Sequence, residues 1–471
     1  MTTTQFTTQF TTLIIDTPSL GDRSYLVHDG SVAFVIDPQR DIDRVLDLLA
    51  GSRVRLTDVF ETHIHNDYIT GGLALAAATG ATYHVNAADP VAFVRHPISD
   101  GETVAVGDRM RVTAIATPGH TFTHLAYALT DADAGTPLSA SEAVFSGGSL
   151  LYGATGRPDL LGADHTHDLG RHQHASAHRL ADVLPDSAAV FPTHGFGSFC
   201  SATQSNASAS TIGDEKRSNP VLTLAEHEWV QDLFAGLDAW PAYYAHMAPG
   251  NLTGPSAPDL SPPPLADPSE LRARIEAGEW VVDLRHRTAF AAGHAPGSLN
   301  FGLDGSFATY LGWLISWGTP LTLLGERPED VALAQRELVR IGIDRPVACG
   351  TGGALDWIGG GDSLASFPTA TFRDLAQVRH QRDVVILDVR RAREYAGGGI
   401  DGAVNIPLHD LPRRLEDVPP GEIWVHCAGG YRASIAASLL DGAGRHVVAI
   451  DDDFAHVSNA GLPVAKPVPV S

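Results

Sequence analysis

Short apolar runs alternate with polar loops along the first 250 residues, in a pattern that predicts sheets combined with helices. Residues 103–110 and 111–117 alternate apolar and polar positions around Gly107-Asp108, which predicts a β-hairpin. Helical patterns follow polar loops at 72–78 and 174–183. We therefore expect two sheets covered by helices, with the chemistry placed on loops at the ends of strands.

The remainder of the chain contains an internal repeat. Residues 281–285 (VVDLR) match residues 386–390 (ILDVR), and 297–300 (GSLN) match 402–405 (GAVN), at the same offset and without gaps. In each copy a helix-capping residue, Asp267 in the first and Thr371 in the second, and a short helix precede an apolar strand. Alternating helices and strands of this kind are typical of a parallel sheet, so the pattern predicts a small α/β domain that is present twice.

Two breaks in composition mark the predicted domain boundaries. A proline-rich, otherwise polar run at 253–267 is typical of an extended, semi-rigid linker. A glycine-rich break follows at 358–369. The predicted division is an N-terminal domain at 1–252, a linker at 253–267, and repeat domains at 268–360 and 368–471. We call these repeat domains the first copy and the second copy.

The balance of charges disfavours several classes of partner. The chain has 32 basic and 55 acidic residues, a net charge of −23, which opposes binding to nucleic acid or to an anionic membrane surface. The absence of an apolar stretch of about 18 residues predicts that no helix crosses a membrane. Three cysteines, Cys200, Cys349 and Cys427, argue against a disulfide framework and for a reducing cytoplasm. The oligomeric state stays open, a homo-oligomer included.

A metal-binding pattern follows the apolar strand that ends at Phe60. The run 62–68 (THIHNDY) places two imidazoles and a carboxylate at alternate positions, and the runs 117–120 (TPGH) and 191–194 (FPTH) each place a His at the end of an apolar strand. Imidazole and carboxylate groups are the ligands that zinc and iron prefer. The candidate metal ligands are His63, His65, Asp67, His120 and His194.

On these motifs, in this order, and on the segment Arg157-Pro158-Asp159, residues 12–250 resemble the metallo-β-lactamase superfamily. Within it they resemble the branch of glyoxalase II and the persulfide dioxygenases. The resemblance implies an αββα sandwich with a two-metal site. However, Tyr68 stands where that site has a fourth donor, a His, and Gly148 stands where it has a bridging Asp. Both losses affect the second metal, so we expect no dinuclear centre.

One metal is therefore expected, Fe(II) as in persulfide dioxygenases, or Zn(II). The resemblance assigns iron to His63, His120 and the Asp that is replaced by Gly148. Either His65 or His194 then completes a three-His site, or water fills the gap, or the site binds no metal. The sequence does not decide between these alternatives, nor does a neutral three-His site decide between the two metals.

Other candidate groups in this domain are weaker. A His-rich run (His165, His167, His172, His174, His178) has the pattern of a loop followed by a surface helix, and we do not expect it to bind a metal. Cys200 follows His194 closely. It is either a thiol at the mouth of a pocket that carries sulfur, or a small buried residue.

A cysteine loop in the second copy is the most specific single motif of the chain. The run 427–432 (CAGGYR) follows an apolar strand at 423–426 and precedes a helix that begins near residue 433. Small residues let successive backbone N–H groups converge on one anion at a helix N-terminus. Together with Arg432, these groups favour a reactive thiolate at Cys427. The anion-binding loop comprises Ala428, Gly429, Gly430 and Tyr431.

With Asp388, Arg390 and the segment 402–405, this loop resembles the rhodanese family over residues 370–471. The resemblance implies that Cys427 accepts sulfane sulfur and carries it as a persulfide, because a loop of this length suits a persulfide rather than a tetrahedral oxyanion. In the first copy the corresponding run at 325–330 (GERPED) has no cysteine and is acidic. We therefore expect the first copy to be an inactive rhodanese-like domain, and Cys349 to be structural.

The two resemblances together imply an enzyme of reactive-sulfur metabolism. The metal domain would oxidise a low-molecular-weight thiol persulfide to sulfite, and the rhodanese would move sulfur between persulfide, thiosulfate and sulfite. Two alternatives stay open for the metal domain. It is a mononuclear zinc hydrolase of thioesters like glyoxalase II, or it is a non-catalytic module that presents persulfide to Cys427.

Overall fold

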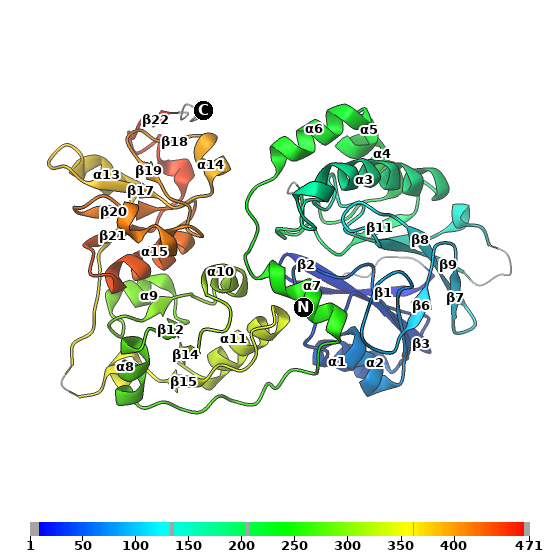
Figure 1. Cartoon of the computed structure of the whole chain (residues 1–471), viewed down its shortest axis with the longest axis horizontal. Coiled ribbons are helices and arrows are strands. Elements are labelled where there is room, and N and C mark those ends of the chain that lie inside the picture. The colour runs from blue at the N-terminus through cyan, green and yellow to red at the C-terminus, as the bar shows by residue number, and fades with distance from the viewer. Residues whose placement is uncertain (1–8, 132–135, 203–206, 361, 466–471) are drawn as a thin grey trace. The chain divides into compact units, whose positions relative to one another are not determined.

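The computed structural model describes residues 9–131, 136–202, 207–360 and 362–465. The chain divides into two compact units (Figure 1). Unit 1 ends at Pro258 and also takes Val339–Gly342, and unit 2 takes the described residues that remain. Each unit is considered by itself below.

Two mixed sheets form the centre of unit 1. The first has the strand order β1-β2-β3-β4-β5-β6, and the second has the order β11-β10-β9-β8-β7. The strands of the first are β1 (Thr11–Thr17), β2 (Asp22–His28), β3 (Val32–Ile36), β4 (Arg55–Phe60), β5 (Thr82–Asn86) and β6 (His96–Ile98). Those of the second are β7 (Thr103–Val106), β8 (Met110–Ala116), β9 (Leu125–Asp131), β10 (Ala143–Gly147) and β11 (Ala189–Pro192). The predicted hairpin is confirmed, since β7 pairs antiparallel with β8.

Helices cover the outer faces of both sheets (Figure 1). The helices α1 and α2 pack on the first sheet through Val45, Leu49 and Leu75. The helices α3 to α6 pack on the second sheet. The bounds are α1 (Asp43–Ser52), α2 (Gly72–Thr79), α3 (Ala163–Val183), α4 (Ile212–Ser218), α5 (Pro220–Thr223), α6 (Glu226–Gly236) and α7 (Tyr244–Thr253), with a 3-10 turn η1 (Leu138–Ala140). The expected αββα sandwich is thus confirmed.

An aromatic core lies between the two sheets. Phe34 packs edge-on against Phe60 and against Phe145, with ring centroids 5.8 Å apart in each pair. These side chains are completely buried. Burial of such large side chains stabilises the sandwich by several kcal/mol, about 2 kcal/mol per side chain. The core fixes the ends of β4, β8, β10 and β11; the predicted metal ligands follow β4, β8 and β11, and Gly148 follows β10.

Unit 2 contains two parallel sheets, one in each copy. In the first copy the strand order is β13-β12-β14-β15, and in the second it is β16-β21-β20-β17-β19. The strands are β12 (Trp280–Asp283), β13 (Leu299–Asn300), β14 (Leu321–Gly325), β15 (Ala348–Thr351), β16 (Thr369–Ala370), β17 (Val385–Asp388), β19 (Val404–Asn405), β20 (Ile423–His426) and β21 (Val447–Ile450). A separate antiparallel pair joins β18 (Gly399–Ile400) to β22 (Val464–Ala465). The predicted parallel α/β architecture is confirmed for both copies.

Two helices of unit 2, α8 and α13, begin where the capping residues predict. Asp267 caps the helix α8, and Thr371 forms a capping box with Asp374 at α13. The helices are α8 (Pro268–Glu276), α9 (Arg287–Ala292), α10 (Phe307–Leu314), α11 (Pro328–Arg340), α12 (Ala354–Ile358), α13 (Phe372–Val378), α14 (Ala392–Ala396) and α15 (Tyr431–Gly442). The 3-10 turns are η2 (Leu411–Arg413), η3 (Leu415–Asp417) and η4 (Phe454–His456).

The internal repeat reappears as the same hydrogen bonds in both copies. Asn300 Nδ2 donates to the backbone oxygens of Asp283 and Arg285, at 3.3 and 3.0 Å. Asn405 Nδ2 donates to the backbone oxygens of Asp388 and Arg390, at 2.9 Å each. The matched side chains of the sequence repeat therefore perform the same structural task, which is to fix the loops that follow β12 and β17.

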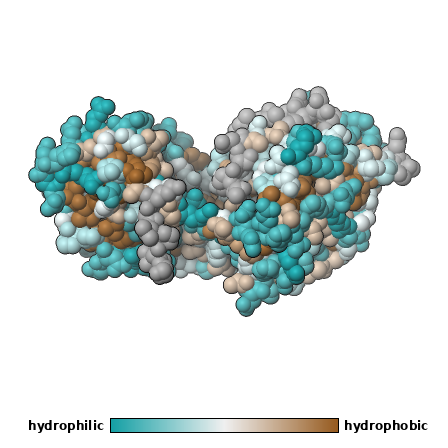
Figure 2. Space-filling model, turned by 90° about the horizontal axis from the view of Figure 1, so that it is seen from above, coloured by the Kyte–Doolittle hydropathy of each residue, from teal (hydrophilic) through white to brown (hydrophobic). Residues whose placement is uncertain are grey.

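No helix in the described part of the chain is both long enough and apolar enough to cross a bilayer. On the face drawn in Figure 2, apolar residues occur in groups between hydrophilic ones. This mixture is usual, since more than half of the accessible surface of a folded protein is contributed by apolar atoms.

Candidate functional site

The loop after β4 carries the first group of predicted ligands, and Asp37 holds its beginning. The strands β3 and β4 are parallel, so their carboxyl ends lie side by side. Asp37, which follows β3, accepts hydrogen bonds from the backbone N–H and the hydroxyl of Thr62, at 2.7 Å each. This fixes the backbone directly before His63. His63, His65 and Asp67 are all buried.

Three of the predicted His ligands meet at one point. Donor atoms of His63, His120 and His194 lie within 4.8 Å of one another, and Nε2 of His194 is 3.4 Å from Nε2 of His63. Nδ1 of His120 lies 2.8 Å from the backbone oxygen of Arg157, a distance at which it donates. Nε2 of His120 is left buried and without a partner. A set of imidazole nitrogens that includes an unpartnered buried one fits a metal ion.

The protonation of these rings differs. Burial and the neighbouring imidazoles lower the pKa of His63 well below its usual value, and lower that of His120 to about 3. Both rings are therefore neutral, as metal ligation requires. Burial also lowers the pKa of His194, but Asp67 and Asp22 outweigh it and raise the pKa to about 10. A metal ion that binds here must displace the proton of His194.

His65 is engaged elsewhere. Its Nε2 lies 2.9 Å from the hydroxyl of Tyr68, 3.2 Å from Glu61 Oε2 and 3.3 Å from Asp37 Oδ1. Burial opposes protonation, but the two carboxylates raise the pKa of His65 to about 9. Donor atoms of His65 also group with Asp67 and His194, and with Asp37 and Glu61. Of the two alternatives for a third ligand, His194 is the one that joins His63 and His120.

Gly148 leaves no space for the carboxylate that the superfamily has at this position. A Cβ atom at Gly148 would lie 2.6 Å from Cγ of His120, which is closer than van der Waals contact allows. The ring of His120 thus fills the volume that any side chain at 148 would enter. The backbone N–H of Gly148 donates to Nε2 of His124 at 2.9 Å, which also fixes the glycine in place.

Sequence reasoning did not identify the acidic residues that surround the ligands. Asp37, Glu61 and Asp22 are buried beside His65 and His194. A signal was present for two of them: Asp37 directly follows the apolar run of β3, and Glu61 directly precedes the THIHNDY run. Such carboxylates orient imidazole ligands and tune their basicity.

Two further predictions for this domain concern Cys200 and the His-rich run. Cys200 is completely buried, and burial raises the pKa of its thiol well above the usual value. It is therefore not a thiol at a pocket mouth, and the alternative of a small buried residue holds. The His-rich run lies entirely within α3, so the prediction of a loop for its first part was wrong. Within the described residues, these His side chains form no cluster of metal donors.

The cysteine loop of the second copy connects β20 to α15. Cys427 follows the last residue of β20, and α15 begins at Tyr431. The backbone N–H of Gly430 donates to Sγ of Cys427 at 3.2 Å. The thiol thus faces the N-terminus of a helix, where unpaired N–H groups favour negative charge. Cys427 is only 2% exposed, so its thiol lies below the surface.

Arg432 is held by an acid that the sequence analysis did not single out. Its Nη1 and Nη2 donate to Glu394 at 2.6 and 2.8 Å, a bidentate pair. Burial would raise the pKa of Glu394, but Arg432 and Arg391 lower it to about 2. At the matching position of the first copy stands Ala289. The comparison of the two copies was therefore an available signal, because the copy without the cysteine also lacks this acid.

Replacement of Glu394 tests this pair through its dependence on pH. The folded pKa lies below the usual 4.5, so the carboxylate stabilises the fold above pH 4.5 and loses this contribution as the pH falls towards 2. Glu394→Gln should lower the free energy of unfolding by about 2 kcal/mol at neutral pH, and the difference from the unmodified chain should shrink with acidification. Urea unfolding at a series of pH values measures it. A difference that does not change with pH, or one equal to that of the exposed Glu416→Gln, would contradict the assignment.

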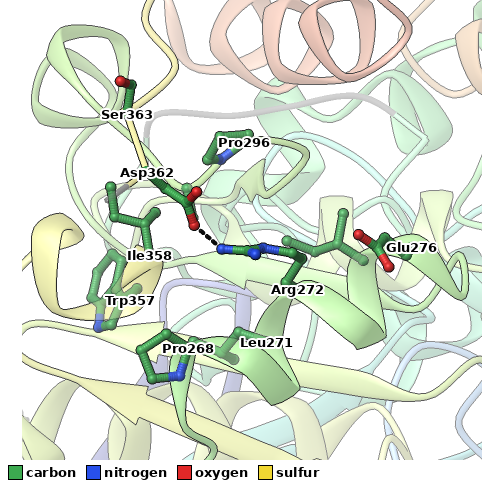
Figure 3. Close-up of a pocket in the computed structure, with 11 residues that line it drawn as sticks. Pro268, Leu271, Arg272, Glu276, Pro296, Trp357, Ile358, Asp362 and Ser363 are labelled. Atoms are coloured by element: carbon green, nitrogen blue, oxygen red, sulfur yellow. Dashed lines mark ion pairs between the residues drawn. The ribbon is translucent and has the colours of Figure 1, made fainter. Parts of the chain in front are cut away.

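The first copy has cavities of its own, separate from the cysteine loop. One, of about 330 Å³, lies between α8 and α12 and is lined by apolar side chains such as Leu271, Ile275 and Trp357. An ion pair of Arg272 with Asp362 crosses it (Figure 3). Its described lining includes neither Cys nor His. A second cavity, of about 200 Å³, lies at the acidic loop 325–330. Neither described lining includes a cysteine.

Known proteins resemble both parts of the chain. A family model described as a rhodanese-like domain matches residues 371–460. The hydroxyacylglutathione hydrolase of Acidiphilium cryptum (strain JF-5) is 29% identical over 235 residues, 47% of this chain and 94% of the relative. The mitochondrial persulfide dioxygenase ETHE1 of Homo sapiens is 28% identical over 214 residues, 45% of this chain and 73% of the relative. The chain spans about half of other hydrolases, such as 54% of that from Fuscovulum blasticum.

A solved structure covers more of the chain. A metallo-β-lactamase from Staphylococcus aureus subsp. aureus COL has a TM-score of 0.64 and 25% identity, and the match covers 73% of this chain and 99% of that one. Together with the sandwich of unit 1 and the cysteine loop of unit 2, these matches indicate the same two parts of the chain. The chain joins an N-terminal domain of the metallo-β-lactamase fold, like glyoxalase II and ETHE1, to a C-terminal rhodanese-like domain.

Proposed function

We propose that this protein is an enzyme of reactive-sulfur metabolism that transfers sulfane sulfur on Cys427. The observation that carries the proposal is the loop itself: Sγ of Cys427 accepts a hydrogen bond from the N–H of Gly430 at the first turn of α15. Negative charge on the attacking sulfur, and later on the bound sulfane sulfur, is favoured at this place. The backbone N–H groups of 428–431 serve as its donors.

The proposed transfer has two balanced steps. The thiolate of Cys427 attacks the outer sulfur of thiosulfate; the S–S bond of thiosulfate breaks, and sulfite leaves with the bonding electron pair. Cys427 then carries a persulfide. The thiolate of a low-molecular-weight acceptor attacks the terminal sulfur, the S–S bond to Cys427 breaks, and the Cys427 thiolate is restored. The reverse sequence, with sulfite as the acceptor, forms thiosulfate.

The residues of the loop have distinct roles in these steps. The pair of Arg432 with Glu394 fixes the guanidinium in one plane, so it orients the first turn of α15 while its charge is compensated. Burial of Cys427 excludes bulk water, which protects the persulfide from side reactions. Substrates with compact, anionic sulfur groups fit such a buried site better than large ones.

For unit 1, we propose a centre for a single metal, held by His63, His120 and His194. The metal, Fe(II) in this proposal, would supply coordination of the substrate sulfur and activation of oxygen. The buried carboxylates Asp67 and Asp22 lie at Nδ1 of His194, so they accept the hydrogen bond of Nδ1–H, orient the ring and leave Nε2 as the nitrogen that would hold the metal. In the overall reaction, a thiol persulfide, oxygen and water give the thiol and sulfite. Sulfite and persulfide are also reactants of the Cys427 site, and a common chain raises their local concentration.

A zinc-dependent thioester hydrolase is the second candidate for unit 1. The similarity to hydroxyacylglutathione hydrolase over 94% of that relative favours it. The three imidazoles suit zinc as well as iron. The two candidates differ in their use of oxygen, so a direct test separates them.

The test begins with two measurements on the full-length protein. Incubation with thiosulfate should add one sulfur atom to Cys427, as seen by peptide mass spectrometry, and release sulfite. Protein loaded anaerobically with Fe(II) should then consume oxygen and form sulfite when glutathione persulfide is added. Zinc-loaded protein that cleaves S-lactoylglutathione without oxygen would instead support the hydrolase. A lack of sulfur on Cys427 would overturn the transferase, and iron-loaded protein without oxygen uptake would overturn the dioxygenase.

A further inference from the structure

The side chain of Tyr431, which belongs to the cysteine loop, lies in the first copy. Its hydroxyl donates to the backbone oxygen of Gly302 at 2.8 Å, and its ring centroid is 6.0 Å from that of Tyr310. A Cβ atom at Gly305 would lie 2.6 Å from Cδ2 of Tyr431, so only glycine leaves room for this ring. Burial, with the nearby Asp304, raises the pKa of Tyr431 well above its usual value. The ring of Tyr431 thus occupies a closely packed site formed by Gly302, Gly305 and Tyr310, which we call the socket.

A second contact from the first copy reaches the neighbouring position of the loop. Nε of Arg287 donates to Asp451 of the second copy at 2.6 Å, and Nη1 donates to Asp304 of the first copy at 2.8 Å. The place that a Cβ atom would take at Gly430 is 3.0 Å from Nε of Arg287. Gly430 and Tyr431 are therefore both in contact with side chains or backbone of the first copy.

The first turns of α15 are attached to the first copy as well. The hydroxyl of Ser434 donates to Oδ1 of Asn300 at 2.7 Å, and the backbone N–H of Asn300 donates to the hydroxyl of Ser438 at 3.1 Å. Asn300 belongs to β13, which is part of the sheet of the first copy. These groups are buried, so each hydrogen bond lost would leave an unpaired polar atom.

We propose that the first copy, which has no cysteine, positions the cysteine loop of the second copy through a socket for Tyr431, formed by Gly302, Gly305 and Tyr310, and through Arg287. The inference rests on the proposed sulfur transfer at Cys427. The N–H of Gly430, in the peptide unit between Gly429 and Gly430, donates to Sγ, and its position depends on how the next residue, Tyr431, is anchored. When Tyr431 leaves the socket, this N–H group loses its fixed direction, and the loop holds the sulfur less well.

The experiment compares variants of the socket with matched controls in the full-length chain. Tyr431→Phe removes only the hydroxyl, and we expect kcat/KM for thiosulfate to fall about 5-fold. Tyr431→Ala empties the socket, and Gly305→Ala blocks it; both should lower kcat/KM about 50-fold. The rate at which iodoacetamide alkylates Cys427 at one neutral pH should fall in the same order. A purely structural role would not produce this graded change in thiol reactivity.

The control variants make the same kinds of substitution at residues outside the socket. Tyr395→Phe removes a hydroxyl that donates to the backbone oxygen of Ala403 at 2.9 Å, and Gly442→Ala adds a methyl group where no atom lies within 4 Å. Both should keep the kcat/KM and the alkylation rate of the unmodified chain. If folded Tyr431→Ala also keeps them, the proposal is overturned; should Gly305→Ala fail to fold, the two Tyr431 variants still decide it. If the unmodified chain transfers no sulfur, the proposed function fails, while the alkylation rates still test the positioning.

Discussion

Cys427→Ser should abolish sulfur transfer from thiosulfate. The hydroxyl of serine is a far weaker nucleophile than a thiolate at a helix N-terminus, and it forms no persulfide. Loss of a nucleophile of this kind typically costs a factor of about 1000 or more in kcat. The effect is expected to be confined to chemistry, because Cys427 is replaced by a side chain of similar size that can still accept the N–H of Gly430.

The measurement is the rate of sulfite release or of cyanolysis with purified, folded protein. Cys349→Ser is the matched control, since Cys349 is a buried thiol of the first copy whose Sγ lies 3.3 Å from the backbone oxygen of Pro263. This variant should transfer sulfur at the rate of the unmodified chain. Activity of Cys427→Ser equal to that of the control would exclude Cys427 as the nucleophile and with it the proposed transferase.

His120→Ala should have the largest effect on metal binding. It removes the imidazole whose Nε2 is buried without a partner, and it leaves the remaining donors His63 and His194 too few to hold an ion well. We expect the affinity for Fe(II) or Zn(II) to fall by a factor of about 100 or more. Metal content by elemental analysis, together with competition against a chelator of known affinity, gives the change directly and does not depend on any activity.

His172→Ala is the control for this substitution. His172 is exposed on α3 within the same unit, and its loss should leave the bound metal unchanged. If His120→Ala binds metal as tightly as His172→Ala, the centre of His63, His120 and His194 is not the metal site. A stoichiometry of two metals in the unmodified chain would contradict the expectation of a mononuclear centre.

Much of the fold follows from local patterns in the sequence. The alternation around Gly107-Asp108 predicted the hairpin of β7 and β8, and the capping residues Asp267 and Thr371 predicted where α8 and α13 begin. These signals depend on neighbours a few residues apart, which is why they can be identified without tertiary information. The His-rich run shows the limit: its polar composition resembled a loop in part, but one apolar face that includes Leu169 and Leu180 holds it in α3.

From the sequence, only those residues of the candidate sites that lie near strand ends could be predicted. His63, His120, His194 and Cys427 were identified because each directly follows or nearly follows an apolar strand. The partners that complete the sites come from distant parts of the chain, such as Asp22 for His194 and Gly302 for Tyr431. Residues that make such contacts have no fixed spacing along the sequence, so no sequence pattern predicts them.

The sequence by itself determined which domains the chain contains and which copy of the repeat has the cysteine, and its resemblance to the metallo-β-lactamase superfamily predicted that Gly148 and Tyr68 replace two donors of a two-metal site. Only the tertiary structure decided that His194 joins His63 and His120, because carboxylates engage Nε2 of His65. It also decided that the inactive copy touches the cysteine loop. The physical reason is the same in both cases: side-chain identity fixes what chemistry is available, while packing fixes which groups are close enough to share it.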